Sequence, residues 1–114
     1  MIDDEFIRQM EQSLQRRLSD LEETEAQNER DRAPVELDQT RVGRLSRMDA
    51  MQGQAMAEAQ QERRRIERLR IETALARIDD GTYGECLRCG DEIAEKRLAA
   101  DPATPVCVDC AGNP

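Results

Sequence analysis

The chain has 114 residues, of which 37% are charged, and Phe6 and Tyr83 are its only aromatic residues. This composition excludes a large globular core, because too little apolar volume is available to fill one. The formal net charge of −8 disfavours binding to the phosphate backbone of nucleic acids. The sequence also contains no apolar run long enough to span a membrane.

A first long helix is predicted over residues 3–30. Its acidic start, Asp3, Asp4 and Glu5, suits a helix N-terminus, where the macrodipole favours negative charge. Pro34 ends any helix before it, so the chain is expected to turn there. Apolar residues recur along this helix at spacings of three and four, the pattern of one buried stripe: Ile7, Met10, Leu14, Leu18 and Leu21.

A second helix is predicted over residues 46–80, with Gly81 as its stop signal. At 1.5 Å per residue it is about 52 Å long, against about 42 Å for the first helix, so part of it is expected to extend beyond its partner. Two helices joined by a polar turn bury their stripes best as an antiparallel coiled-coil hairpin. The apolar positions of the second helix are Leu45, Met48, Ala55, Ala59, Ile66, Leu69, Leu75 and Ile78.

Charge patterning supports this pairing. Residues 1–40 hold twelve acids and five bases, a net charge of −7, whereas residues 41–78 hold five acids and nine arginines, a net charge of +4. The arginine cluster of the second helix is therefore expected to face the acidic first helix rather than nucleic acid. The cluster comprises Arg63, Arg64, Arg65, Arg68 and Arg70. Met48, Met51 and Met56 are expected to fill the seam between the helices, although methionines also suit an adaptable protein-binding surface.

All four cysteines lie in one segment, as two CxxC pairs separated by seventeen residues: Cys86 and Cys89, then Cys107 and Cys110. Two such pairs close a tetrahedron around one metal ion, so we expect a single zinc ion. Four protein ligands leave no open position, which makes the zinc structural. The spacing does not exclude iron, and a zinc site that also senses oxidants through its thiols is a further alternative.

Disulfides are disfavoured, because the acidic N-terminus has no apolar secretory segment and a cytoplasmic location is expected. The sequence thus predicts a mainly α fold: a long antiparallel coiled-coil helical hairpin with a small four-cysteine zinc-finger module at its base. The hairpin is assigned to residues 1–80, with its tip near 31–45, and the module to residues 81–114. Ile93 and Leu98 are expected to form a small core in the module, with Tyr83 at its junction with the second helix.

The segment from Gly81 to Cys110 resembles the zinc-finger region of the DksA/TraR family of bacterial transcription regulators. The preceding helical hairpin agrees with the architecture of that family, and the segment VELDQTRVGRLSRMDAMQ is similar to one in its shorter members. The matching positions in the zinc-finger region are Gly81, Tyr83, Gly84, Cys86, Cys89, Gly90, Ile93, Arg97, Leu98, Ala100, Pro102, Cys107 and Cys110.

The resemblance implies a monomeric, cytoplasmic protein that binds RNA polymerase directly, without binding DNA. It would insert its coiled-coil tip into the secondary channel of the polymerase and modulate transcription initiation, with acidic tip residues near the catalytic magnesium. The DxxDxA triplet of longer members is absent, and the candidate tip residues are Glu36, Asp38 and Asp49. Asp38 also suits a helix N-cap, and Asp49 suits an ordinary solvated helix position. Lys96 and Arg97 are candidates either for contacts at the channel rim or for offsetting thiolate charge.

Two other functions remain open from the residues alone. One is a zinc-finger adaptor that binds another protein through its hairpin, and the other is a stress sensor in which oxidation of the cysteines releases zinc. An enzyme is not expected, because the chain has no histidine, no glycine-rich phosphate loop and no nucleophile beside a general base.

Overall fold

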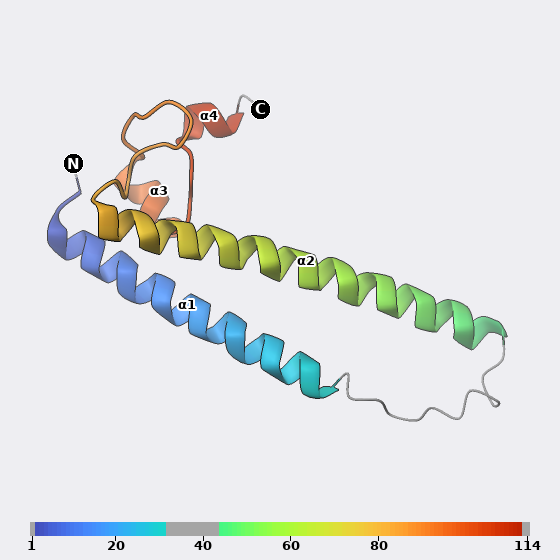
Figure 1. The fold of residues 1–114 in the computed structure, drawn as a ribbon. Coiled ribbons are helices and arrows are strands. Elements are labelled where there is room, and N and C mark those ends of the chain that lie inside the picture. Colours follow the sequence, from blue (N-terminus) through green and yellow to red (C-terminus); the bar gives the residue numbers. More distant parts are fainter. Residues whose placement is uncertain (1, 32–43, 113–114) are drawn as a thin grey trace.

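The computed structural model of the chain describes residues 2–31 and 44–112 (Figure 1). Over these residues it has no β-strand beyond one isolated bridge between Glu85 and Glu92. No helix in this part of the chain is long and apolar enough to cross a membrane. The helices are α1 (Asp4–Asp31), α2 (Arg44–Asp80), α3 (Glu95–Ala100) and α4 (Val108–Gly112).

The two long helices form an antiparallel hairpin, and the four-cysteine module lies at the end where α1 begins and α2 ends (Figure 1). This arrangement confirms the predicted mainly α hairpin with the module at its base. With 37 residues against 28, α2 extends beyond α1, as expected. The predicted turn near Pro34 lies outside the described residues.

Local signals at the base of the hairpin, where α1 begins and α2 ends, act as the sequence predicts. At the start of α1, the Asp3 carboxylate accepts a hydrogen bond from the backbone N–H of Phe6 at 2.8 Å, which caps the helix. At the end of α2, Gly81 adopts a positive φ of 82°. The N–H of Thr82 then donates to the Arg77 carbonyl at 2.9 Å, which satisfies one of the last carbonyls of the helix.

The seam between α1 and α2 occupies the half of the hairpin next to the module. Leu14 of α1 and Ile71 of α2 are completely buried, and Ala74 lies beside them. Farther from the module, a polar cleft of about 530 Å³ separates the helices, with Glu22 and Glu58 among its lining residues. Partly buried apolar residues complete the core: Ile2, Phe6, Ile7, Met10, Leu18, Leu21, Leu75 and Ile78.

The prediction that the methionines and the first apolar positions of α2 fill this seam is wrong. Met48, Met51 and Met56 are 59%, 70% and 65% exposed, and Ala55 and Ala59 are exposed as well. Ile66 and Leu69, also assigned to the seam, are 46% and 48% exposed.

The reason is that α2 carries two apolar faces. Ile71 packs against α1, and at 100° per residue Ile66 points about 140° away from it around the helix. Periodicity reveals that a helix has an apolar stripe, but not which neighbour covers the stripe.

The arginine cluster pairs with α1 at one position. Arg68 forms an ion pair with Glu25 of α1, as the charge pattern predicts. Arg70 pairs instead with Asp101 of the module at 2.9 Å, and Arg65 pairs with Glu62 of its own helix at 2.7 Å. Charge segregation therefore predicts the general pairing of the helices but not the individual partners.

Candidate metal centre

A tight turn presents the first cysteine pair. The backbone N–H of Cys86 donates to the Asp91 carbonyl at 2.8 Å, and the Gly90 N–H donates to the Cys86 carbonyl at 3.0 Å. Gly90 has a φ of 80°, a conformation that residues with a side chain rarely adopt. The turn also directs the N–H of Arg88 toward the Cys86 sulfur at 3.4 Å.

The second pair flanks the start of α4. The backbone N–H of Ala111 donates to the Cys107 carbonyl at 2.9 Å. Two hydrogen bonds connect the cysteine pairs: the Leu87 N–H donates to the Pro105 carbonyl at 2.9 Å, and the Arg88 guanidinium donates to the Cys110 carbonyl at 3.0 Å. The two CxxC turns are thereby held facing each other.

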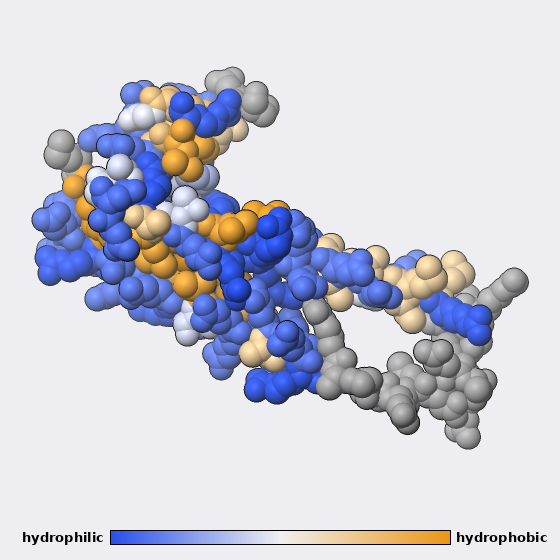
Figure 2. Space-filling view, viewed as in Figure 1, coloured by the Kyte–Doolittle hydropathy of each residue, from blue (hydrophilic) through white to orange (hydrophobic). Residues whose placement is uncertain are grey.

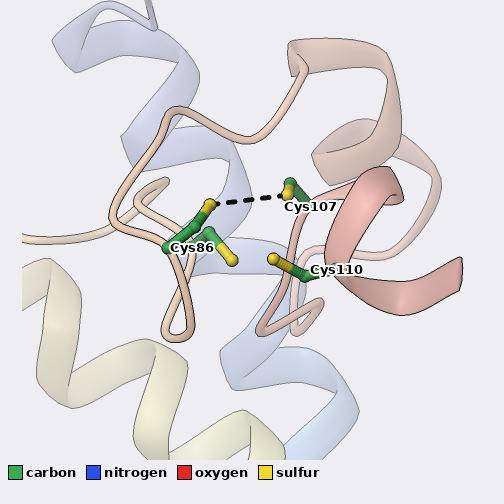
Figure 3. Close-up of side chains that lie close together, drawn as sticks. Cys86, Cys107 and Cys110 are labelled. Carbon is green, nitrogen blue, oxygen red and sulfur yellow. Dashed lines mark hydrogen bonds between the residues drawn. The ribbon is translucent and has the colours of Figure 1, made fainter. Parts of the chain in front are cut away.

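The four cysteine sulfurs all lie within 4.8 Å of one another, and the sulfurs of Cys89 and Cys107 are 3.7 Å apart. Figure 3 shows side chains of both pairs directed toward a common centre. A tetrahedral zinc ion with zinc–sulfur bonds of about 2.3 Å requires sulfurs about 3.8 Å apart, which fits this spacing. A disulfide requires about 2.05 Å, and all four cysteines are free. The donor set and its geometry therefore form a metal-binding centre of the kind typical of zinc.

The electrostatics of the cluster also fit a cation. Burial opposes ionisation of Cys86, but backbone N–H groups, including those of Cys89, Cys107 and Arg88, lower its pKa to about 6. At Cys110, the neighbouring Cys107 thiol, together with Cys86 and burial, raises the pKa to about 12. The surrounding backbone thus favours the thiolate of Cys86, and a bound divalent cation would favour the ionised form of all its thiol ligands.

A small core supports the cysteine turns, as predicted. Leu98 of α3 is completely buried and Ile93 is 4% exposed. Tyr83 lies at the junction with α2 and donates its hydroxyl to the Pro102 carbonyl at 2.9 Å. Burial, with a smaller effect of the Asp101 charge, raises the pKa of Tyr83 to about 12, so this donor keeps its proton.

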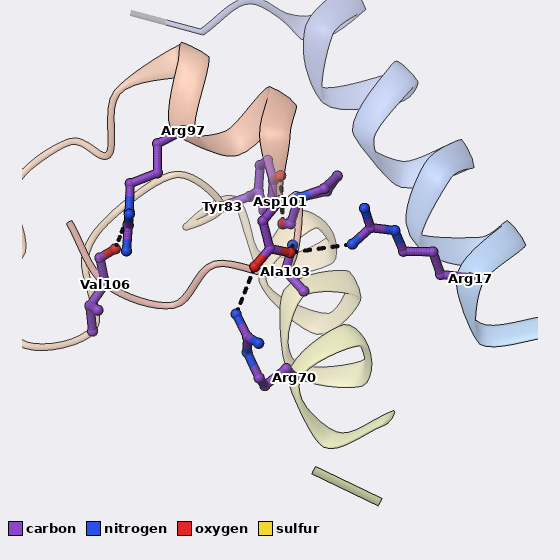
Figure 4. A network of polar contacts seen from close by, with 8 residues as sticks. Arg17, Arg70, Tyr83, Arg97, Asp101, Ala103 and Val106 are labelled. Carbon is purple, nitrogen blue, oxygen red and sulfur yellow. Dashed lines mark hydrogen bonds and ion pairs between the residues drawn. The ribbon is translucent and has the colours of Figure 1, made fainter. Parts of the chain in front are cut away.

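Asp101 connects the module to both long helices (Figure 4). Its carboxylate accepts hydrogen bonds from Arg17 of α1 at 3.3 Å and from Arg70 of α2 at 2.9 Å. It also accepts the backbone N–H of Ala103 at 3.2 Å. Sequence reasoning missed this residue, because its partners lie 84 and 31 positions away and nothing in the local sequence identifies them.

The remaining candidate residues differ in exposure and in their hydrogen bonds. Arg97 donates to the Val106 carbonyl at 3.0 Å and is half-buried, so its guanidinium is used inside the module, whereas Lys96 is exposed. Asp49 is exposed on α2, toward the end remote from the module (Figure 1). Glu36 and Asp38 lie outside the described residues.

Comparison with known proteins gives a match to the prokaryotic dksA/traR C4-type zinc finger over residues 81–112. An uncharacterised protein of Aquifex aeolicus is 56% identical over 41 residues, which cover 36% of this chain and 28% of that protein. The RNA polymerase-binding transcription factor DksA of Escherichia coli K12 is 42% identical over 41 residues, 36% of this chain and 27% of that protein. The matched segment thus spans little more than a quarter of the length of these relatives.

Two solved structures are similar over most of the chain. Transcription factor DksA2 from Pseudomonas aeruginosa has a TM-score of 0.71 and 25% identity, covering 96% of this chain and 83% of that one. The DnaK suppressor protein of Agrobacterium tumefaciens C58 has a TM-score of 0.57 and 28% identity, covering 93% and 91%. The zinc-finger match and the shared hairpin architecture agree with each other. Residues 81–112 thus form a zinc finger of the DksA/TraR family, and the chain as a whole shares the architecture of DksA2.

Proposed function

We propose that the protein is an RNA polymerase-binding transcription regulator that inserts its hairpin tip into the secondary channel and modulates initiation without binding DNA. The observation that carries this proposal is the architectural match with DksA2, which spans the hairpin as well as the module. Relatives of the module are described as RNA polymerase-binding transcription factors.

The shape and charge of the molecule suit this role. Its extents are 63 × 30 × 20 Å, and a narrow rod enters a channel that a globular domain of the same mass does not. The end of α1 and the start of α2, which flank the predicted tip, lie far from the module (Figure 1). Glu36, Asp38 and Asp49 supply carboxylates of the kind that interact with Mg²⁺. The net charge of −8 opposes binding to duplex DNA.

In this proposal Cys86, Cys89, Cys107 and Cys110 hold one structural zinc ion. The ion supplies positive charge and a cross-link between the two CxxC turns, while the backbone N–H groups around Cys86 orient and stabilise its thiolate. Four thiolate ligands leave no position for a substrate, which supports a non-enzymatic role. The proposal takes the regulator to be monomeric and cytoplasmic, as the family resemblance implies. Lys96 and Arg97 remain proposed contacts at the channel rim, where Arg97 would use nitrogens that do not donate to the Val106 carbonyl.

The test is binding of the zinc-loaded protein to core RNA polymerase, together with transcription from a promoter that forms short-lived complexes. Asp38→Asn and Asp49→Asn remove the candidate tip charges, and Asp20→Asn, an exposed acid on α1, is the matched control. We expect all four proteins to bind and one tip variant to lose its effect on transcription. Absence of wild-type binding at micromolar concentration would contradict the proposal.

A second candidate function, an adaptor for another protein, is favoured by one observation: the unburied methionines and aliphatic residues of α2. The same experiment separates the two functions, because an adaptor does not bind the polymerase or change its transcription.

A further inference from the structure

The apolar seam between α1 and α2 stops partway along the hairpin. After Leu21, the rest of α1 contains a single apolar residue, Ala26, and that residue is exposed. Figure 2 shows this end of α1 as mainly hydrophilic surface. Because α1 has almost no apolar surface to bury beyond Leu21, the helices depend on polar and charged contacts in this far half of the hairpin.

Charged side chains of both helices line the polar cleft of about 530 Å³ in the far half. One ion pair crosses the cleft, between Glu25 of α1 and Arg68 of α2. The side chain of Arg64, one turn from Arg68 on the same wall, has no ion pair or hydrogen bond with the described residues. The same is true of Glu29 on the opposite wall. The other charged lining residues are Glu22, Glu58 and the pair that Glu62 and Arg65 form within α2.

Two enclosed donors in this cleft lack acceptors. The Nε atoms of Arg64 and Arg68 are enclosed, and neither has a hydrogen-bond partner within the part of the chain that the structure describes. A donor that is removed from water and left unpaired is unfavourable, and more so in a charged group. A closer approach of the two helices would bring carboxylates of the α1 wall to these donors.

The register of the hairpin identifies the carboxylate that Arg64 would meet. Because the helices are antiparallel, moving four residues on from Glu25 along α1 corresponds to moving four residues back from Arg68 along α2. These moves lead to Glu29 and Arg64, and residues four apart share one helix face. Followed seven residues toward the module, the same register matches two residues of the core: Leu18 and Leu75.

We propose that the far half of the hairpin closes when Arg64 forms an ion pair with Glu29, one turn beyond the pair of Arg68 and Glu25. The structure shows the open state, in which the cleft separates the helices. An ion pair near the surface contributes little free energy, so neither state is strongly favoured. Salt screens the pair, so the ionic strength shifts the balance between the two states. This closure occurs in the free protein and does not depend on polymerase regulation.

The test measures the distance between the helices of the zinc-loaded full chain by electron spin resonance. Spin labels attached through unnatural amino acids at Thr24 and Gln60 leave the four cysteines free, and both positions are exposed and outside the cleft lining. We expect the distance to shorten as sodium chloride falls from about 1 M to about 0.01 M, because the Debye length rises from about 3 Å to about 30 Å. Labels at Gln12 and Ala76, exposed positions in the seam half, should keep their distance.

Charge variants identify the ion pair. Arg64→Gln and Glu29→Gln each remove one charge and should each abolish the shortening at low salt, while the thermal transition is retained. Glu29→Arg combined with Arg64→Glu exchanges the two charges and should restore the shortening. Arg63→Gln removes the neighbouring charge, which does not line the cleft, and should behave as wild type.

Three results would overturn the proposal. The first is a distance between positions 24 and 60 that does not change with salt. The second is a shortening that persists in Arg64→Gln or Glu29→Gln. The third is an exchanged variant that behaves like the single variants, because Arg64 and Glu29 would then not meet.

Discussion

The carboxylate of Asp101 contacts three separate parts of the fold: Arg17 on α1, Arg70 on α2 and the backbone of Ala103. Partial burial raises its pKa, but the charge of Arg70 and the hydrogen bonds outweigh this effect and leave the pKa below its ordinary value. A lowered folded-state pKa means that the ionised form stabilises the fold above the ordinary aspartate pKa. This stabilisation is lost as the pH falls through the folded pKa.

Asp101→Asn should therefore lower the free energy of unfolding by about 1 kcal/mol at neutral pH, since each partly exposed ion pair contributes about 0–1 kcal/mol. Chemical denaturation of the zinc-loaded protein measures the change, with Asp20→Asn as the control. The difference from wild type should shrink at high salt, which screens the pairs. Equal stability of the Asp101 and Asp20 variants would show that the carboxylate does not fasten the module to the hairpin.

Replacing two of the glycines by alanine should change the free energy of unfolding in opposite directions. Gly84 has a φ of 93°, and an added Cβ would lie 2.7 Å from the Ile2 side chain, so Gly84→Ala should destabilise by about 1–3 kcal/mol. Gly53 lies in exposed helix with nothing within 4 Å of an added Cβ, and Gly53→Ala should stabilise by about 1 kcal/mol. Thermal unfolding of both variants measures the two changes in stability, and a neutral Gly84→Ala would contradict the positive φ of Gly84.

At the residue scale, the sequence predicts features that depend on near neighbours. The cysteine spacing predicts the metal cluster, because each CxxC pair is a short local motif. Gly81 predicts the end of α2, because a helix stop signal acts on the residues next to it. The contact of Ile2 with Gly84 and the contacts of Asp101 join distant segments. Their partners become visible only when the hairpin brings those segments together.

At the scale of elements, the two apolar faces of α2 differ in what they contribute to stability. Leu14→Ala in the buried seam should cost about 2–5 kcal/mol, because it leaves a cavity against Ile71. Leu69→Ala, at a side chain that is 48% exposed, should change stability by about 0.5 kcal/mol or less. Denaturant unfolding of the two variants measures the contrast, and equal losses would mean that the face of α2 around Leu69 is buried in solution.

The helices themselves were predictable, because their periodicity and end signals are local. Their ends fall within about two residues of the predicted bounds 3–30 and 46–80. The extent of the seam was not predictable in the same way. Met48 and Ile71 are both apolar positions of one helix, and only the placement of α1 decides that one is exposed and the other buried.

The zinc module should depend on its metal. Binding of zinc contributes about 10–16 kcal/mol in small zinc-finger peptides, so Cys86→Ser or a strong chelator should unfold the module and lower the thermal transition. Because the hairpin is assigned to residues 1–80 and the module to residues 81–114, we expect the hairpin to keep part of the helical circular dichroism signal after the module unfolds. Val108→Ser lies between two ligand positions and should behave as wild type. A thermal transition that a strong chelator leaves unchanged would contradict a structural metal.

At the scale of the whole molecule, the described chain is a rod, and the proposed function assigns separate roles to its base and its tip. The base holds the cysteine cluster and the contacts of Asp101, and the hairpin extends away from it (Figure 1). In the proposed function, zinc bound at the base fixes the direction of the hairpin, and the candidate tip acids act on the polymerase. Exposed apolar side chains of α2, among them Met48, Ile66 and Leu69, lie along the hairpin.

The most direct test of polymerase regulation through the tip is to locate the tip in the complex with RNA polymerase. Replacing the catalytic magnesium with Fe²⁺ generates hydroxyl radicals at the polymerase active centre, and these cleave only the nearby backbone of a bound protein. We predict cleavage between residues 32 and 49 and none in the zinc module. Cleavage in the module, or no cleavage of a protein that binds, would contradict insertion of the hairpin tip.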